Sequence, residues 1–125
     1  MLLDTCALLW LTQGGSQLTG EACRRIDAAP SVSISAITGF EIGIKCAAGK
    51  LTLPARPEEW LEAVLAHHGI AVIPLDLRIC VAATQLPTVH RDPCDRLIIA
   101  TARVHGLPVV TADARFASYG VQVVW

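Results

Sequence analysis

The sequence predicts an α/β fold of three layers, in which helices cover both faces of a central, mainly parallel sheet. Short β-branched or apolar runs alternate with helical patterns along the whole chain, as expected where helices connect parallel strands. Runs such as PVV and VQVVW are largely apolar, which is typical of strands buried on both faces. With 53% hydrophobic and 17% charged residues, we expect one compact domain spanning residues 1–125.

The first half of the chain is expected to begin with a short buried strand. Its elements are predicted as strands at 1–3 and 31–35 and helices at 5–11, 19–28, 36–48 and 57–68. The first three helices have suitable N-caps in Asp4, Thr19 and Ser35, and glycine or proline follows each of them. The strand SVSIS alternates small polar and β-branched residues, the pattern of one buried face. The 57–68 helix begins with Pro57 and two acids and is strongly amphipathic.

The second half continues the alternation of strands and helices. We expect strands at 70–75, 107–111 and 121–125, and helices at 77–85, from residue 93 onward, and at 114–118. The stretch HRDPCDRLIIATA, residues 90–102, passes directly from a polar loop into an apolar helix. Asp92 is a good N-cap there, and Pro93 suits the first helical position, where its missing N–H costs nothing.

Composition excludes several classes of protein. No apolar run approaches the roughly 18 residues that a membrane-spanning helix needs, and the apolar N-terminus carries Asp4 and lacks the basic residues of a signal peptide. The five cysteines are widely spaced and contain no CxxC pair, which indicates a reduced, cytoplasmic protein without zinc. The formal net charge of −1 neither indicates nor excludes a nucleic-acid substrate, because only local basic groups matter.

Two acids lie on helix faces that are otherwise apolar. Their neighbours at helical spacing are Ile98, Ile99 and Ala102 for Asp95, and Ile37, Ile44 and Ala48 for Glu41. An ionised carboxylate on a buried face is costly unless something compensates it. Plain structural explanations exist, because Asp95 favours the positive end of its helix and Glu41 can pair with Lys45 one turn later.

Two further acids are expected at the carboxyl edge of the sheet, where open parallel sheets build their sites. Asp4 ends the first strand, and Asp113 follows the 107–111 strand. Helix capping explains both of them singly. If all four acids converge, each pair at about 4 Å repels by roughly 4 kcal/mol at an effective dielectric near 20. A cation would relieve this repulsion, and an all-carboxylate site selects Mg²⁺ or Mn²⁺.

Four stretches together carry a resemblance to a known family. LLDTCALLW, SAITGFEIGIK with GKL, HRDPCDRLIIATA and LPVVTADARF, in this order and spacing, resemble PIN-domain nucleases, and more narrowly the VapC-type ribonuclease toxins of bacterial toxin–antitoxin pairs. The resemblance runs nearly end to end and implies a PIN-like domain. It departs from the family pattern at Cys6, at Cys94 and at Gly39-Phe40, none of which replaces a carboxylate.

The resemblance implies a set of site residues. The family's acidic cluster falls on Asp4, Glu41, Asp95 and Asp113, of which Asp4 and Asp95 are the expected direct metal ligands. Glu41 and Asp113 are expected to bind through water, to complete a second ion's site or to act as general base. Supporting roles fall on Thr5, Asp92 and Thr111, although capping is sufficient to explain Asp92. Candidate RNA contacts are Lys45, His90, Arg91, Arg96 and Arg115, for which solvated surface charge or pairing with the acids is an equal alternative.

The implied function is that of a metal-dependent endoribonuclease, the toxin of a toxin–antitoxin pair, acting in the cytoplasm. Its implied partners are an RNA substrate, a cognate antitoxin and a second copy of the chain. The 57–68 helix and the early helices offer apolar surface for such contacts, although the same apolar stripes are more often plain core. Alternatives are an RNA-processing PIN nuclease without an antitoxin and an inactive RNA-binding PIN module. An aspartate-nucleophile phosphatase is disfavoured because Cys6 stands where a second acid is needed, and a signalling receiver lacks its acidic pair.

Overall fold

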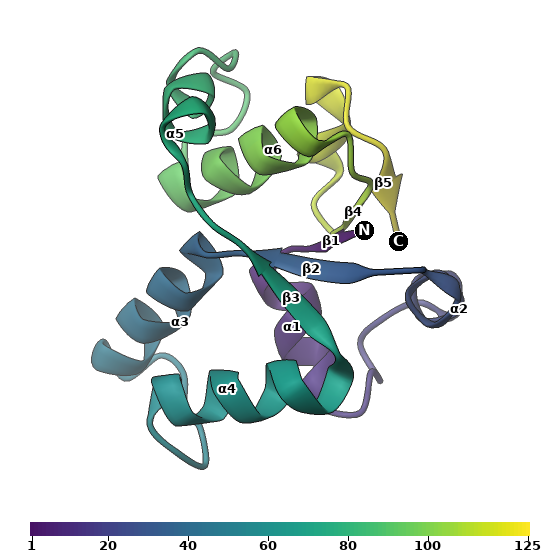
Figure 1. The fold of residues 1–125 in the computed structure, drawn as a ribbon, viewed down its shortest axis with the longest axis vertical. Helices are drawn as coiled ribbons and strands as arrows, with labels where there is room; N and C mark the ends of the chain where they lie inside the picture. Colours follow the sequence, from purple (N-terminus) through teal and green to yellow (C-terminus); the bar gives the residue numbers. More distant parts are fainter.

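The computed structural model describes residues 1–125 as a five-stranded parallel sheet with helices on both faces (Figure 1). The strands are β1 (Leu2–Leu3), β2 (Val32–Ser35), β3 (Ile70–Ile73), β4 (Val109–Val110) and β5 (Val123–Val124). The helices are α1 (Thr5–Thr12), α2 (Gly20–Ala28), α3 (Ile37–Ala47), α4 (Pro57–His68), α5 (Leu77–Thr84) and α6 (Pro93–His105), with a 3-10 helix η1 (Ala114–Tyr119). The predicted α/β class is confirmed, and the sheet is parallel throughout. None of the helices combines the length and apolar character that crossing a membrane requires.

Two hydrophobic cores lie on opposite faces of the sheet. Leu2 and Val109 belong to the core beneath α5 and α6, whereas Leu3 and Val110 belong to the core beneath α1 and α2. Successive side chains of a strand point to opposite faces, so each two-residue strand contributes to both cores. Figure 1 shows the result, with α5 and α6 on one side of the sheet and α1, α3 and α4 on the other. These layers are the three that the apolar strands predict.

Most strands are shorter than the sequence predicts. The 107–111 and 121–125 segments pair over only two residues each, because β4 pairs with β1 and β5 pairs with β4 in register. The central strand β1 is itself limited to two residues, since Asp4 leaves the sheet to cap α1. The central strand therefore limits how far its neighbours on that side can pair.

Helix starts follow the expected capping residues with one exception. Asp4 accepts from the backbone N–H of Ala7 at 2.7 Å, and Thr19 and Asp92 also cap their helices as predicted. Ser35 is wrong as the N-cap of α3, because it is still paired in β2 and Ala36 occupies the cap position.

The large hydrophobic side chains that are most exposed are concentrated on a few elements. The most exposed large hydrophobic side chains lie mainly on α3, α5 and β3, among them Phe40, Ile44, Leu77 and Val81, and none lies on α1, α2 or α4. The apolar side of α4, including Trp60 and Leu61, packs instead against the core beneath α1. No residue of α4 is fully buried, so its apolar side keeps partial exposure while it packs on the core.

The strand order β3-β2-β1-β4-β5 determines where a site can form. From the central β1 the chain moves outward through β2 and β3, and then returns to β4 on the other side. The crevice at the carboxyl ends of the strands beside such a reversal is the usual place for a ligand in an open parallel sheet. Asp4 leaves β1 at that edge.

Candidate functional site

Asp4 is both a helix cap and an acid whose burial is poorly compensated. Its side chain is 7% exposed. Burial raises the pKa of Asp4, hydrogen bonds from Thr111 and Ala7 oppose that rise, and the charges of Glu41 and Asp113 add to it. The cap and the Thr111 hydroxyl therefore hold the carboxylate in place without removing its electrostatic cost.

Asp113 stands in the opposite electrostatic situation. Arg115 binds both of its carboxylate oxygens, with Nη2 2.8 Å from Oδ2 and Nε 3.0 Å from Oδ1, and its backbone N–H donates to Oδ1 at 3.0 Å. The Arg115 side chain is the main cause that lowers the pKa of Asp113 to about 2. Thr111 accepts the backbone N–H of Asp113 at 3.0 Å and so fixes the turn after β4. In this structure Arg115 neutralises an acid of the site.

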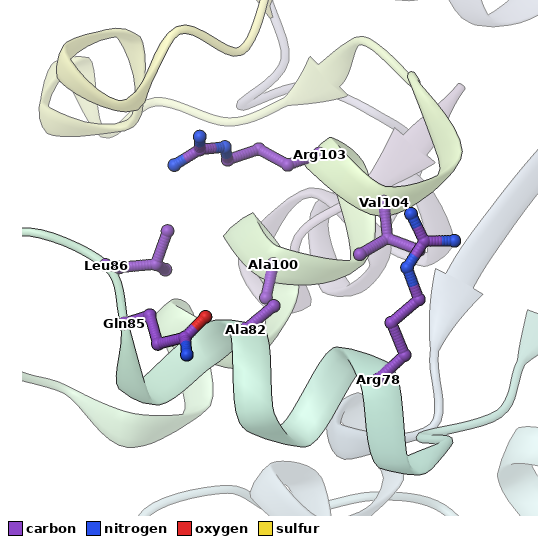
Figure 2. A pocket seen from close by; sticks show the side chains of 7 residues that line it. All are labelled: Arg78, Ala82, Gln85, Leu86, Ala100, Arg103 and Val104. Carbon is purple, nitrogen blue, oxygen red and sulfur yellow. The ribbon is translucent and has the colours of Figure 1, made fainter.

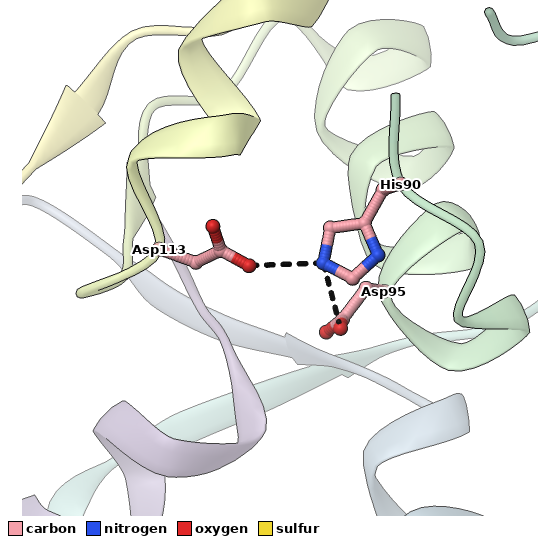
Figure 3. A group of neighbouring side chains, drawn as sticks. All are labelled: His90, Asp95 and Asp113. Atoms are coloured by element: carbon pink, nitrogen blue, oxygen red, sulfur yellow. Dashed lines mark hydrogen bonds and ion pairs between the residues drawn. The ribbon is translucent and has the colours of Figure 1, made fainter. Parts of the chain in front are cut away.

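His90 lies between Asp95, in the first turn of α6, and Asp113, at the start of η1 (Figure 3). The imidazole Nε2 lies 2.9 Å from Asp113 Oδ2 and 3.1 Å from Asp95 Oδ2. Burial raises the pKa of Asp95 to about 6; His90 opposes this rise, and Asp92, Glu41 and Asp4 reinforce it. The helix α6 thus begins at the carboxyl edge of the sheet and brings Asp95 within range of the other acids.

Glu41 completes the cluster from α3. Its Oε1 accepts the Thr5 hydroxyl at 2.5 Å, its Oε2 lies 3.7 Å from Lys45 Nζ, and the Thr5 hydroxyl lies 3.3 Å from that of Thr38. Thr38 is fully buried and is the residue that the sequence reasoning missed, although a hydroxyl one turn before Glu41 on the same helix is a readable signal.

The face of α3 that carries Glu41 is not a buried stripe, and the prediction is wrong here. Ile44 is 50% exposed and Ala48 is exposed, whereas Thr38 and Ile42 are fully buried. The buried stripe is rotated by about one residue, or roughly 100° around the helix, so Glu41 lies at its border. This position lets the carboxylate reach the site without being enclosed in the core.

The basic residues divide into two groups. Arg96 donates to four backbone carbonyls, those of Ala83, Leu86, Pro87 and His90, at 2.7–3.0 Å, so its guanidinium holds the loop before α6. Arg91 is exposed, and Lys45 keeps a side-chain exposure of 34% beside Glu41. Lys45 and Arg91 therefore remain accessible to a phosphate, while Arg96 is engaged in the fold.

A divalent cation fits the donor set. Carboxylate oxygens of Asp95 and Asp113 lie within 4.8 Å of each other and of a ring nitrogen of His90. The raised pKa values of Asp4 and Asp95 show that negative charge is under-compensated in this part of the site. Burial, reinforced by the acids, also raises the pKa of the nearby Cys94 thiol to about 11, so it stays protonated at neutral pH. The available ligands are then mainly hard oxygens, which suit Mg²⁺ or Mn²⁺.

The hollow between α5 and α6 has a different character (Figure 2). It measures about 440 Å³ and is lined by Arg78, Ala82, Gln85, Leu86, Ala100, Arg103 and Val104. No carboxylate, thiol or imidazole lines it, so it offers neither a metal ligand nor a general base. The chemistry of the chain is concentrated at the acid cluster.

Comparisons with known proteins agree with this geometry. A family model described as PIN domain matches residues 1–122. Ribonuclease VapC22 of Mycobacterium tuberculosis (strain ATCC 25618 / H37Rv) is 29% identical over 120 residues, which cover 95% of this chain and 91% of that protein.

Solved structures show the same fold at lower identity. A toxin–antitoxin complex from Klebsiella pneumoniae has a TM-score of 0.68 at 23% identity, covering 99% of this chain and 95% of that one. VapBC2 from Rickettsia felis, bound to a DNA fragment from their promoter, has a TM-score of 0.71 at 15% identity, covering 98% and 95%. At these identities the solved structures show a shared fold alone, whereas the family-model match over residues 1–122 shows the family.

Proposed function

The chain belongs to the PIN domain family, and we propose that it is a metal-dependent endoribonuclease that acts as the toxin of a toxin–antitoxin pair. The observation that carries the proposal is the acid cluster, in which Asp95 has a pKa raised to about 6 by burial and by neighbouring acids. A protein gains nothing in stability from such an arrangement. Nuclease chemistry explains it, and the similarity to a VapC ribonuclease supports the choice of RNA.

Asp4 and Asp95 are the proposed direct ligands of Mg²⁺ or Mn²⁺, with Asp113 completing the set. When bound, such an ion supplies charge neutralisation at the phosphoryl oxygens and an acidified water. The chain's own residues hold the geometry: Thr111 supports Asp4, and Thr5 supports Glu41 through its 2.5 Å hydrogen bond. Fixed carboxylates of this kind cost no reorganisation during the reaction.

Glu41 is the proposed general base. The reaction forms a bond between a water oxygen and phosphorus and breaks a P–O ester bond of the RNA, whose leaving oxygen takes up a proton from solvent. It also requires a group that takes the proton of the attacking water. Asp113 is a poor proton acceptor, because Arg115 lowers its pKa to about 2. Lys45, beside Glu41, and the exposed Arg91 are the proposed contacts for RNA phosphates.

Cleavage of a structured RNA tests this function. We expect the wild-type protein to cleave with Mg²⁺ or Mn²⁺ and to stop on addition of chelator, and we expect Asp4→Asn and Asp95→Asn to lose at least about 100-fold in rate, as removal of a charge-stabilising group does. Cleavage in chelator, or cleavage undiminished in both variants, would exclude the mechanism. A fold check by circular dichroism on each variant separates loss of chemistry from loss of structure.

An antitoxin and a second copy of the chain are the proposed partners. The structural likeness to toxin–antitoxin complexes supports the antitoxin, and the exposed side chains Phe40, Ile44, Leu77 and Val81 supply apolar surface for protein contacts. Five free cysteines support action in the reducing cytoplasm. Co-expression with the product of a short neighbouring reading frame should give a stable complex that no longer cleaves RNA. Failure to obtain such a complex would favour the alternative of an RNA-processing nuclease without an antitoxin.

A further inference from the structure

We propose that His90 is a positioning residue whose Nε2–H holds the carboxylates of Asp95 and Asp113 together, and that it is not itself a metal ligand. The inference rests on the proposed metal-dependent function. It assigns a role to the one buried imidazole at the site, which is 3% exposed and therefore closed to direct contact with an RNA chain.

The neighbouring donors assign the imidazole tautomer. The backbone N–H of Asp92 points at His90 Nδ1 across 3.3 Å. A backbone N–H always donates, so Nδ1 must accept and carries no proton. The ring proton then sits on Nε2, the atom that lies 2.9 Å from Asp113 Oδ2 and 3.1 Å from Asp95 Oδ2. This N–H donates to Asp113, and Asp95 Oδ2 lies at ion-pair distance from the same nitrogen.

Contacts other than the two acids hold both the backbone and the ring of His90. The backbone N–H of His90 donates to the Tyr119 hydroxyl at 2.6 Å, and Tyr119 in turn donates to the Pro87 carbonyl at 2.8 Å. The His90 carbonyl accepts from Arg96 at 3.0 Å. Phe116 packs edge-on against the imidazole, with ring centroids 5.9 Å apart at 83°. The backbone of His90 is thus held by Tyr119 and Arg96, and its ring by Phe116 and by the Asp92 N–H, so the imidazole is placed independently of the carboxylates.

Direct coordination by His90 conflicts with the same geometry. A nitrogen that binds a metal ion must be unprotonated, so the proton would have to move from Nε2 to Nδ1. Nδ1–H would then face the Asp92 N–H at 3.3 Å, two donors opposed to each other. A hydrogen bond to ligating carboxylates avoids this conflict. Donors in that role typically contribute 10–100-fold to metal affinity.

Mn²⁺ binding to the full chain tests the role without depending on catalysis. His90→Phe keeps a planar ring against Phe116 but removes the donor, whereas His90→Gln keeps an N–H near the position of Nε2. We expect Mn²⁺ titration by electron paramagnetic resonance to show affinity at least about tenfold weaker for His90→Phe, and within about threefold of wild type for His90→Gln. Pulsed measurements on Mn²⁺-bound wild type should show no directly coordinated nitrogen.

The possible outcomes separate this inference from the proposed function. Nitrogen coupling of a direct ligand in wild type, or equal affinity in wild type and His90→Phe, would overturn the positioning role, and the wild-type measurement stands even if a variant fails to fold. Equal weakening in His90→Gln and His90→Phe would also overturn it, because the restored donor should rescue. If wild type binds Mn²⁺ as described but cleaves no RNA, the proposed function fails while the role of His90 holds.

Discussion

Replacing Asp95 with asparagine should stabilise the metal-free protein while abolishing its chemistry. Asparagine has nearly the same shape and can still accept the N–H of His90 through its carbonyl oxygen. The pKa of Asp95 rises from 3.8 to about 6 on folding. A shift of about two units corresponds to about 3 kcal/mol of destabilisation of the ionised form at neutral pH.

The sign of this effect depends on pH in a definite way. The folded state binds the Asp95 proton more tightly than the unfolded state, so stability falls as pH rises from near 3.8 to near 6. At pH 7.5 the ionised Asp95 of wild type carries the full penalty of about 3 kcal/mol. Asp95→Asn also loses the favourable interaction of the charge with the helix N-terminus, which lowers its gain by about 0.5 kcal/mol. At pH 4 the penalty is below about 1 kcal/mol, because Asp95 is protonated in the folded wild type.

Urea unfolding in chelator at pH 7.5 and pH 4 measures the difference. Asp95→Asn should be about 2–3 kcal/mol more stable than wild type at pH 7.5, with an unchanged dependence on urea, and near wild type at pH 4. Asp92→Asn is the matched control, since Asp92 is an exposed cap and asparagine caps equally well. Equal or lower stability of Asp95→Asn at pH 7.5, or a gain that persists at pH 4, would refute the assignment of Asp95 as a partly buried acid whose charge is under-compensated.

Three other perturbations address neighbouring parts of the site. Arg115→Ala should raise the pKa of Asp113 from about 2. In wild type the ionised Asp113 carboxylate stabilises the fold above its unfolded pKa, and this stabilisation is lost as pH falls toward 2. Acid unfolding curves should show a smaller loss in the variant. Arg96→Met should lower the free energy of unfolding by roughly 3 kcal/mol, because several partly buried carbonyls lose their charged donor, and thermal or urea unfolding checks this. Thr5→Val, which removes the hydroxyl that holds Glu41, should lower the RNA cleavage rate about tenfold or more, while Thr5→Ser should cleave near the wild-type rate.

Features that depend on nearby residues could be predicted from the sequence. Asp4, Thr19 and Asp92 cap their helices because a cap involves only the next two or three residues of the chain. The covered parallel sheet could also be predicted, because strands buried on both faces are continuously apolar, and this shows in the sequence of each strand. Ser35 shows the limit, since pairing of β2 with β3 keeps Ser35 in the strand and leaves the N-cap position to Ala36, although the Ser35 hydroxyl still accepts the N–H of Ile37 at 3.3 Å.

The partners of the site residues depend on the tertiary structure. The sequence by itself determined that the four acids are present, with Asp4, Asp95 and Asp113 near element ends and Glu41 within a helix. Only the fold brings together Thr5 and Glu41, which are 36 residues apart, and His90 and Asp113, which are 23 apart. Hydrogen bonds and ion pairs act over a few ångströms, so which donor reaches which carboxylate depends on packing, and spacing along the chain does not encode it.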